Sequence, residues 1–207
     1  MGKYVVYDLE MCKVPKGDAR DAFGAPRELI QIGAVKLDED LNEIDTFMTY
    51  VKPRFGFIDE FIERLTGIKQ TDVECAPSTE EAIEAFLSWI PEDAQLVSWS
   101  ESDIYQLYKE IDGKGIDSPR LEELLEDSFD CQREFEDRIN ARRSYGLADA
   151  LMITGIDCDE EIHNGLVDAK NTALLFAKLQ KEPTLKMSEY YLTEDDMRGY
   201  MSSSKLK

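Results

Sequence analysis

The stretch Tyr4-Val-Val-Tyr-Asp-Leu-Glu10 joins four strand-forming residues to carboxylates at positions 8 and 10. Successive side chains of a β-strand point to opposite faces, so we expect Asp8 and Glu10 to point to the same side. Two adjacent carboxylates repel each other unless a cation or a proton relieves the repulsion. Mg²⁺ and Mn²⁺ prefer oxygen ligands. The stretch therefore predicts a buried strand that ends at a divalent-metal site.

The alternative for this pair is chance, because 44 of the 207 residues are Asp or Glu. At that density the pattern Asp-x-Glu arises by coincidence. Its position favours a site, since an acidic pair at the end of an apolar strand is harder to explain as a solvated surface. Asp8 and Glu10 are therefore the first candidate ligands.

The composition predicts one globular domain with a sizeable core. Hydrophobic residues make up 43% and aromatic residues 10% of the 207 positions, which argues against disorder. We expect the domain to cover residues 1–181. The apolar pattern weakens from Glu182 onward, so residues 182–207 are expected to form a tail that packs loosely or is partly disordered.

The net charge of −20 opposes tight binding of long duplexes, because a protein that neutralises many phosphates needs a basic face. The densest basic cluster, Arg133, Arg138, Arg142 and Arg143, either contacts a phosphate backbone or forms a solvated, self-paired helix with its acidic neighbours. We predict weak, salt-sensitive binding to short single strands.

The cysteines show neither a Cys-x-x-Cys pair nor a disulfide pattern, which predicts a reduced chain in the cytoplasm. The chain runs directly into its first strand, so no targeting segment is expected. No apolar run approaches the roughly 18 residues of a membrane span, so we expect no membrane association.

The periodicity of the chain predicts an α/β fold with a mixed sheet flanked by helices. Its first three strands are expected to be antiparallel, because a turn at Asp38–Asn42 links two of them directly. A polar loop is expected from Met11 to Arg27. The expected strands are Tyr4–Glu10, Leu29–Leu37, Ile44–Val51 and Ala94–Trp99, and the main expected helices are Phe57–Leu65, one that begins at Ser78, Ser102–Ile111, Leu147–Ile153 and Gly165–Leu179.

Further candidates for chemistry follow a later strand and begin a later helix. Asp103 enters a helix directly after the Ala94–Trp99 strand, and Asp168 lies in the first turn of another helix. His163, the one histidine of the chain, stands five residues before Asp168. A lone His is often a surface or capping residue. Here its position on a loop beside a helix-anchored carboxylate is typical of a general base.

These motifs together resemble the DEDDh group of 3′-to-5′ exonucleases, which has the RNase H-like fold. The resemblance covers residues 3–180, and its Ser-Trp-Ser-x-x-Asp form is most similar to the exoribonuclease branch that trims histone mRNA and small RNAs, with its bacterial relatives. The motifs are Asp8-Leu-Glu10, Ser98-Trp-Ser-Glu-Ser-Asp103 and His163 with Asp168, and the supporting stretches are Glu28–Val35, Leu65–Ile68, Gly146–Ala150 and Asp168–Thr172.

The resemblance implies a metal-dependent exonuclease acting on single-stranded RNA or DNA. Asp8, Glu10, Asp103 and Asp168 would hold two Mg²⁺ or Mn²⁺ ions about 4 Å apart, with His163 as the base, and the products would be nucleoside 5′-monophosphates.

The resemblance also places Met11, Leu65 and Thr66 at the terminal nucleotide, although each also suits ordinary packing. Trp99 either lines that pocket or belongs to the core, which is the commoner fate of a Trp that ends a buried strand.

Two other functions remain open from the sequence. One is a catalytically inactive nucleic-acid-binding module, and the other is a phosphodiesterase of the same fold acting on very short oligonucleotides, which would suit the acidic surface. The expected partner is the 3′ end of a short single strand. A protein partner is possible for longer substrates. The choice between RNA and DNA depends on contacts to the 2′-hydroxyl, which no spacing rule reveals.

Overall fold

The strand that carries the acidic pair lies at the centre of a five-stranded sheet. The computed structural model describes residues 2–157 and 163–188. The strand order is β3-β2-β1-β4-β5, with β1 Tyr4–Lys13, β2 Arg27–Leu37, β3 Glu43–Tyr50, β4 Gln95–Ser98 and β5 Phe129–Asp130. β1, β2 and β3 pair antiparallel, whereas β4 and β5 run parallel to β1. The predicted mixed sheet with three antiparallel strands is confirmed.

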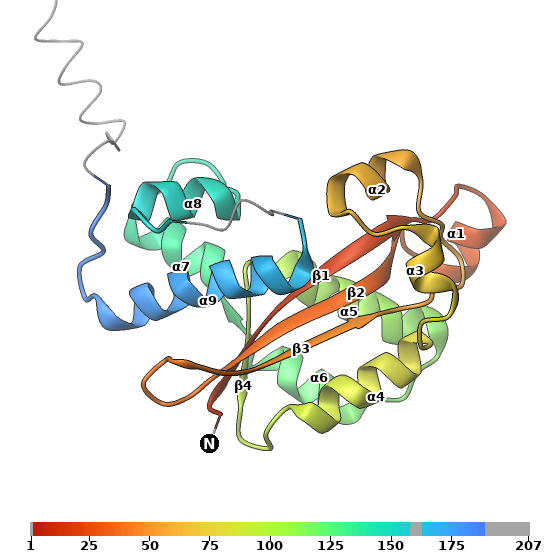
Figure 1. Cartoon of the computed structure of the whole chain (residues 1–207), viewed down its shortest axis with the longest axis horizontal. Helices are drawn as coiled ribbons and strands as arrows, with labels where there is room; N and C mark the ends of the chain where they lie inside the picture. Colours follow the sequence, from red (N-terminus) through yellow and green to blue (C-terminus); the bar gives the residue numbers. More distant parts are fainter. Residues whose placement is uncertain (1, 158–162, 189–207) are drawn as a thin grey trace, which may run out of the picture.

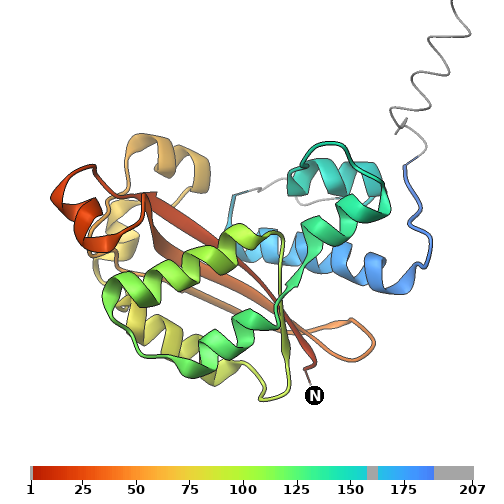
Figure 2. The same cartoon turned by 180° about the vertical axis from the view of Figure 1, so that it is seen from behind.

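Helices cover both faces of this sheet (Figures 1 and 2). On one face lie α4 (Thr79–Trp89), α5 (Glu101–Lys114) and α6 (Pro119–Glu126), and on the other α7 (Cys131–Arg138), α8 (Leu147–Thr154) and α9 (Gly165–Lys181). Each layer encloses its own apolar core against the strands. Within the described ranges, no helix is both long and apolar enough to cross a bilayer.

Three short helices gather at the end of the sheet where β1 finishes (Figure 1). They are α1 (Asp18–Phe23), α2 (Glu60–Thr66) and α3 (Gln70–Glu74). The expected loop from Met11 to Arg27 is wrong in part, because β1 continues to Lys13 and α1 follows it. The cause is tertiary packing: Phe23 is buried and stacks on Phe55 with ring centroids 5.3 Å apart.

Local capping signals place several helix ends. Ser78 and Glu81 form the predicted capping box, with Ser78 N donating to Glu81 Oε2 at 2.8 Å and Ser78 Oγ accepting from Glu81 N at 3.3 Å. The helix expected from Phe57 begins instead at Glu60, because Asp59 accepts a bond from Ile62 N and acts as its N-cap.

A buried ionic cluster anchors β2 to α5 and to the chain before α2. Glu28 accepts bonds from the backbone N–H groups of residues 54, 55 and 56, at 2.6–2.7 Å. Lys114 Nζ lies 2.7 Å from both Glu28 and Glu110, whose side chains are 0% exposed. The cluster fixes the chain that leads into α2.

The register of β1 against β2 shifts directly after Glu10. Glu10 lies opposite Gln31 whereas Met11 lies opposite Leu29, so β2 carries an extra residue at this point. The freed N–H of Leu29 donates to Glu110 Oε1 at 2.7 Å. Bulges of this kind bend a strand and redirect its side chains, and they are common beside active sites.

The end of the described chain returns to α8. Ser188 N donates to Ile153 O at 2.7 Å, and Leu185 packs against the core around α9. Residues 189–207 of the expected tail lie outside the described residues, so the boundary after residue 181 stays a prediction.

Candidate active site

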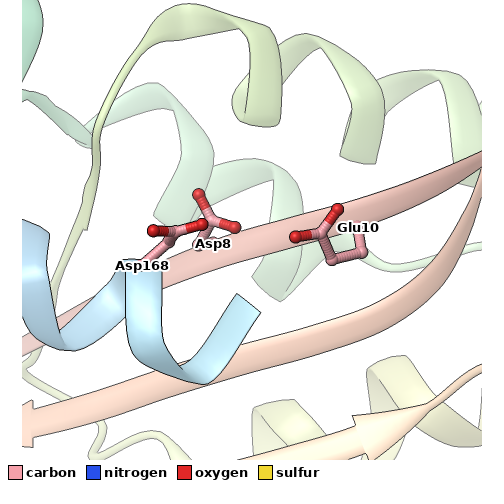
Figure 3. A group of neighbouring side chains, drawn as sticks. All are labelled: Asp8, Glu10 and Asp168. Carbon is pink, nitrogen blue, oxygen red and sulfur yellow. The ribbon is translucent and has the colours of Figure 1, made fainter. Parts of the chain in front are cut away.

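Three carboxylates from two elements converge on one point (Figure 3). Asp8 and Glu10 project from the same face of β1, and Asp168 projects from the first turn of α9. One carboxylate oxygen from each residue lies within 4.8 Å of those from the other two. A donor set made only of carboxylate oxygens suits a hard divalent cation such as Mg²⁺ or Mn²⁺.

The fourth predicted carboxylate, Asp103, lies beside this group without belonging to it. It stands in the first turn of α5 and is 6% exposed. Its negative charge contributes to raising the pKa of both Asp8 and Glu10, as expected of a close neighbour. The structure thus brings all four predicted ligands together beside the middle of β1, which continues past Glu10 to Lys13, and three of them lie within direct reach of one another.

Burial and mutual repulsion raise the pKa values of the carboxyl groups in the cluster. Desolvation is the largest cause for each group: it raises the pKa of Asp8 well above its usual range, that of Glu10 to about 8 and that of Asp103 to about 7. The neighbouring carboxylates add to these shifts, while the Arg27 guanidinium lowers the pKa of Asp103. Without a cation the cluster therefore retains protons, which a divalent metal would displace.

The two oxygens of Asp168 have different surroundings. Oδ2 accepts a hydrogen bond from the backbone N–H of His163 at 2.9 Å. Oδ1 is buried and no donor meets it in good hydrogen-bond geometry among the described residues, although the side chain of Asn171 lies near enough to lower the pKa of Asp168. Buried polar atoms are nearly always satisfied, so an oxygen left free beside two other carboxylates fits a cation ligand. Burial raises the pKa of Asp168, and the bond from His163 N opposes that shift.

Side chains hold the start of α9 in place. Asn164 is the N-cap residue and its Oδ1 accepts bonds from Leu166 N at 3.1 Å and Val167 N at 3.4 Å. His163 has a φ of 75°, the left-handed region that residues other than glycine rarely adopt. The conformation of His163 is therefore imposed by its neighbours, a common property of functional residues.

His163, whose N–H is bonded to Asp168, also borders a pocket. The pocket holds about 370 Å³ and is lined by Tyr50, Leu65, Thr66, Gly67, Ile68, His163 and Asn164. Two of the three predicted nucleotide contacts, Leu65 and Thr66, thus share a pocket with the predicted base. The sequence analysis missed Tyr50 and Asn164. An Asn directly before a helix is a recognisable N-cap signal, whereas nothing local shows which face of β3 Tyr50 occupies.

The remaining predicted residues lie elsewhere. Met11 packs against the core between the sheet and α4 and α5, outside this pocket, and its contact with a nucleotide stays a prediction. Trp99 is 8% exposed and packs against Phe135, with ring centroids 6.3 Å apart, so it belongs to the core.

The basic cluster is partly self-paired. Arg138 Nε lies 2.6 Å from Glu134 Oε1, and the guanidinium of Arg143 lies 4.4 Å from the ring centroid of Tyr145. Arg138 is therefore engaged within the fold, as the self-paired alternative predicts.

Comparison with known proteins agrees with the geometry. Residues 5–176 match the model of the exonuclease family, RNase_T. The chain belongs to the exonuclease family. The DEDDh-type 3′-to-5′ exonuclease resemblance is thereby confirmed at the level of the family.

Relatives of this exonuclease-family chain include RNA- and DNA-related proteins. It is 29% identical over 187 residues to ERI1 exoribonuclease 2 of Danio rerio, matching 79% of this chain and 33% of that protein. It is 27% identical over 178 residues to the PolC-type DNA polymerase III of Caldanaerobacter subterraneus, matching 86% of this chain and 12% of the polymerase. The chain therefore spans a third or less of these relatives.

Solved structures share the fold. The nuclease domain of 3′hExo, a DEDDh family member bound to rAMP, superimposes with a TM-score of 0.71 at 21% identity, covering 90% of this chain and 96% of that domain. Exonuclease I of E. coli in complex with a dA16 oligonucleotide gives a TM-score of 0.65 at 14% identity, covering 88% and 42%. The predicted RNase H-like fold class is confirmed.

Proposed function

We propose that this chain is a 3′-to-5′ exonuclease that releases nucleoside 5′-monophosphates from the free 3′ end of single-stranded RNA or DNA. The observation that carries the proposal is the convergence of Asp8, Glu10 and Asp168 within 4.8 Å, in a chain of the exonuclease family. The pocket of about 370 Å³ that His163 borders supports the proposal, because it offers a space where a terminal nucleotide could bind.

The carboxylates are suited to hold divalent cations. Asp8, Glu10, Asp168 and Asp103 would bind two Mg²⁺ or Mn²⁺ ions, and the unpaired Oδ1 of Asp168 together with the raised pKa values of the cluster supports this assignment. Such ions, when bound, favour ionisation of the attacking water and stabilise charge on the phosphoryl group and on the departing 3′-oxygen.

His163 acts as the general base in this proposal. It takes the proton from the attacking water, a task that a neutral imidazole ring performs in many enzymes. Asp168 Oδ2 holds the backbone of His163 through the 2.9 Å bond to its N–H, so the same carboxylate serves the cation site and the base.

The pocket accounts for binding of the terminal nucleotide. Leu65 and Tyr50 offer apolar and aromatic surface to a base or sugar, and Thr66 closes the pocket at the end of α2. The hydroxyl of Thr66 is engaged by Ile62 O at 2.9 Å, so Thr66 contributes shape more than a free donor. Because the net charge is −20, we propose short single strands as substrates, with binding that weakens as salt rises.

A digestion experiment tests the activity. RNA and DNA single strands of matched sequence, labelled at the 5′ end, are incubated with Mn²⁺, with Mg²⁺ or with EDTA. We expect a ladder that shortens from the 3′ end, requires metal, disappears in Asp8→Ala and falls to a slow residual rate in His163→Ala. Glu39→Gln, which neutralises an exposed carboxylate in the β2–β3 turn, serves as the matched control and keeps full activity.

The same experiment separates the alternatives. Hydrolysis of dinucleotides without any polymer ladder would replace the proposal with a phosphodiesterase acting on very short oligonucleotides. Retained binding with no hydrolysis of any substrate would indicate an inactive nucleic-acid-binding module.

A further inference from the structure

We propose that Gln31 is a positioning residue that ties the first turn of α9 to the sheet and thereby sets the place of His163 relative to Asp8 and Glu10. The inference rests on the proposed function for its catalytic consequence. Its structural part is independent of activity.

The contact is direct and buried. Gln31 is 0% exposed and lies in the middle of β2, opposite Glu10 on β1. Its Oε1 accepts a hydrogen bond from Gly165 N at 2.8 Å, across 134 residues of sequence. Gly165 is the first residue of α9. The N–H groups of the first helical turn have no partner within the helix, so the N–H of Gly165 needs one from outside. The bond thus joins β2, the neighbour of the strand that carries Asp8 and Glu10, to the helix that carries Asp168.

The two backbones approach so closely that only glycine fits at position 33. A Cβ at Gly33 would lie 2.1 Å from the carbonyl carbon of Gly165, and a Cβ at Gly165 would lie 2.9 Å from Gln31 Oε1. We call Gln31, Gly33 and Gly165 the sheet–helix latch. The contact between Gly33 and Gly165 limits how closely α9 approaches the sheet, and the bond to Gln31 holds Gly165 at that distance.

His163 depends on the latch through the chain between them. It lies two residues before Gly165 and keeps a left-handed conformation, with φ at 75°. Such a conformation persists only when surrounding contacts determine it. Asp168 holds the N–H of His163, but Asp168 belongs to the same helix turn. The hydrogen bond to Gln31 fixes the position of this turn relative to the sheet.

The chemistry of Gln31 indicates a conservative replacement. Its Nε2 is buried and has no hydrogen-bond partner among the described residues. Glutamate at this position keeps the acceptor for Gly165 N and loses only that unused donor. It adds a negative charge opposite Glu10, which saturating Mn²⁺ should offset. Methionine has a similar size and shape but no acceptor, so it removes the bond with little change of volume.

The kinetic test is a double-mutant cycle at saturating Mn²⁺. Gln31→Met should lower kcat by about 10- to 100-fold, as expected for a displaced base, with KM nearly unchanged. In the His163→Ala background the same substitution should cost nothing further, because Gln31 acts through His163. Gln31→Glu should restore most of kcat. Gln95→Met is the matched control, since Gln95 donates to Asp127 O at 3.0 Å at the start of β4.

A second readout does not require activity. The chain has one histidine, so the Cε1–H and Cδ2–H signals of an untagged sample in a proton–carbon NMR spectrum come from His163 alone, and both are called its imidazole signal here. Gln31→Met should shift or broaden this signal and should remove the hydrogen-exchange protection of the Gly165 amide. Gln95→Met should leave both unchanged, and Gln31→Glu should keep the protection of the Gly165 amide.

The outcomes are decisive in both directions. The proposal would be overturned if Gln31→Met lowered kcat equally in the presence and absence of His163. It would also be overturned if Gln31→Met left both the imidazole signal and the protection of the Gly165 amide unchanged. If Gln31→Met does not fold, the shorter Gln31→Asn is measured in the same cycle. A wild-type protein without nuclease activity would refute the proposed function, while the NMR readout would still decide on the latch.

Discussion

Replacing Glu10 by the neutral, isosteric Gln should stabilise the metal-free protein at alkaline pH. Burial, followed by the charges of Asp168 and Asp103, raises the pKa of Glu10 from 4.5 to about 8. The folded state therefore holds this proton more tightly than the unfolded state. The stability that the protonated Glu10 carboxyl group contributes to the folded state is fully present below about pH 4.5 and is lost as the pH rises through about 8.

The size of the effect follows from that difference in pKa. Each pKa unit corresponds to about 1.4 kcal/mol, so the ionised Glu10 carries a destabilisation of about 4 kcal/mol near pH 8. Glu10 is partly exposed, so water screens its charge and we expect about 2 kcal/mol. For a chain of this length about 2 kcal/mol corresponds to about 4–8 °C in Tm.

Thermal unfolding in EDTA measures this effect. Glu10→Gln should raise Tm by about 4–8 °C near pH 8 and by much less near pH 5, where the wild-type group is protonated. Saturating Mn²⁺ should reverse the order, because the variant has lost a ligand. Glu84→Gln, which neutralises an exposed carboxylate on α4, should change nothing. An unchanged or lower Tm for metal-free Glu10→Gln near pH 8 would refute the reasoning.

Three further predictions concern the site and the fold around it. Asp168→Asn and Asp168→Ala should both reduce hydrolysis by at least about 100-fold, but Asn keeps an acceptor for His163 N and should melt higher than Ala in EDTA. Lys114→Met leaves Glu28 and Glu110 buried without a cation, so urea unfolding should show a loss of about 3–5 kcal/mol, and an unchanged midpoint would contradict this. Ser78→Ala removes the α4 capping box and should cost about 1 kcal/mol in the same assay, with the specific activity unchanged.

The features that the sequence predicted correctly depend on local rules. Alternation along a strand places Asp8 and Glu10 on one face whatever the rest of the chain does. The Asp38–Asn42 turn predicts the antiparallel pairing of β2 and β3, and Asp38 Oδ1 indeed accepts bonds from the N–H groups of residues 40 and 42.

The features that escaped prediction depend on contacts between distant segments. The bond from Gly165 N to Gln31 spans 134 residues, and no periodicity of either segment indicates it. α1 forms because Phe23 stacks on Phe55. The bulge after Glu10 is stabilised by the bond from Leu29 N to Glu110 on α5. A residue such as Gln31, polar in an apolar strand, is the kind of local inconsistency that marks a functional neighbourhood.

The central claim is that water attacks the terminal phosphodiester and releases a nucleoside 5′-monophosphate, with Asp8, Glu10 and Asp168 holding the metal and His163 taking the proton. Digestion of a short single-stranded RNA in ¹⁸O-labelled water with Mn²⁺, followed by mass spectrometry of the products, tests it most directly. We expect 5′-monophosphates that each carry one heavy oxygen on phosphorus, released by wild type and only at a slow residual rate by His163→Ala. Products that end in a 3′-phosphate or a cyclic phosphate, or equal release by His163→Ala, would contradict it.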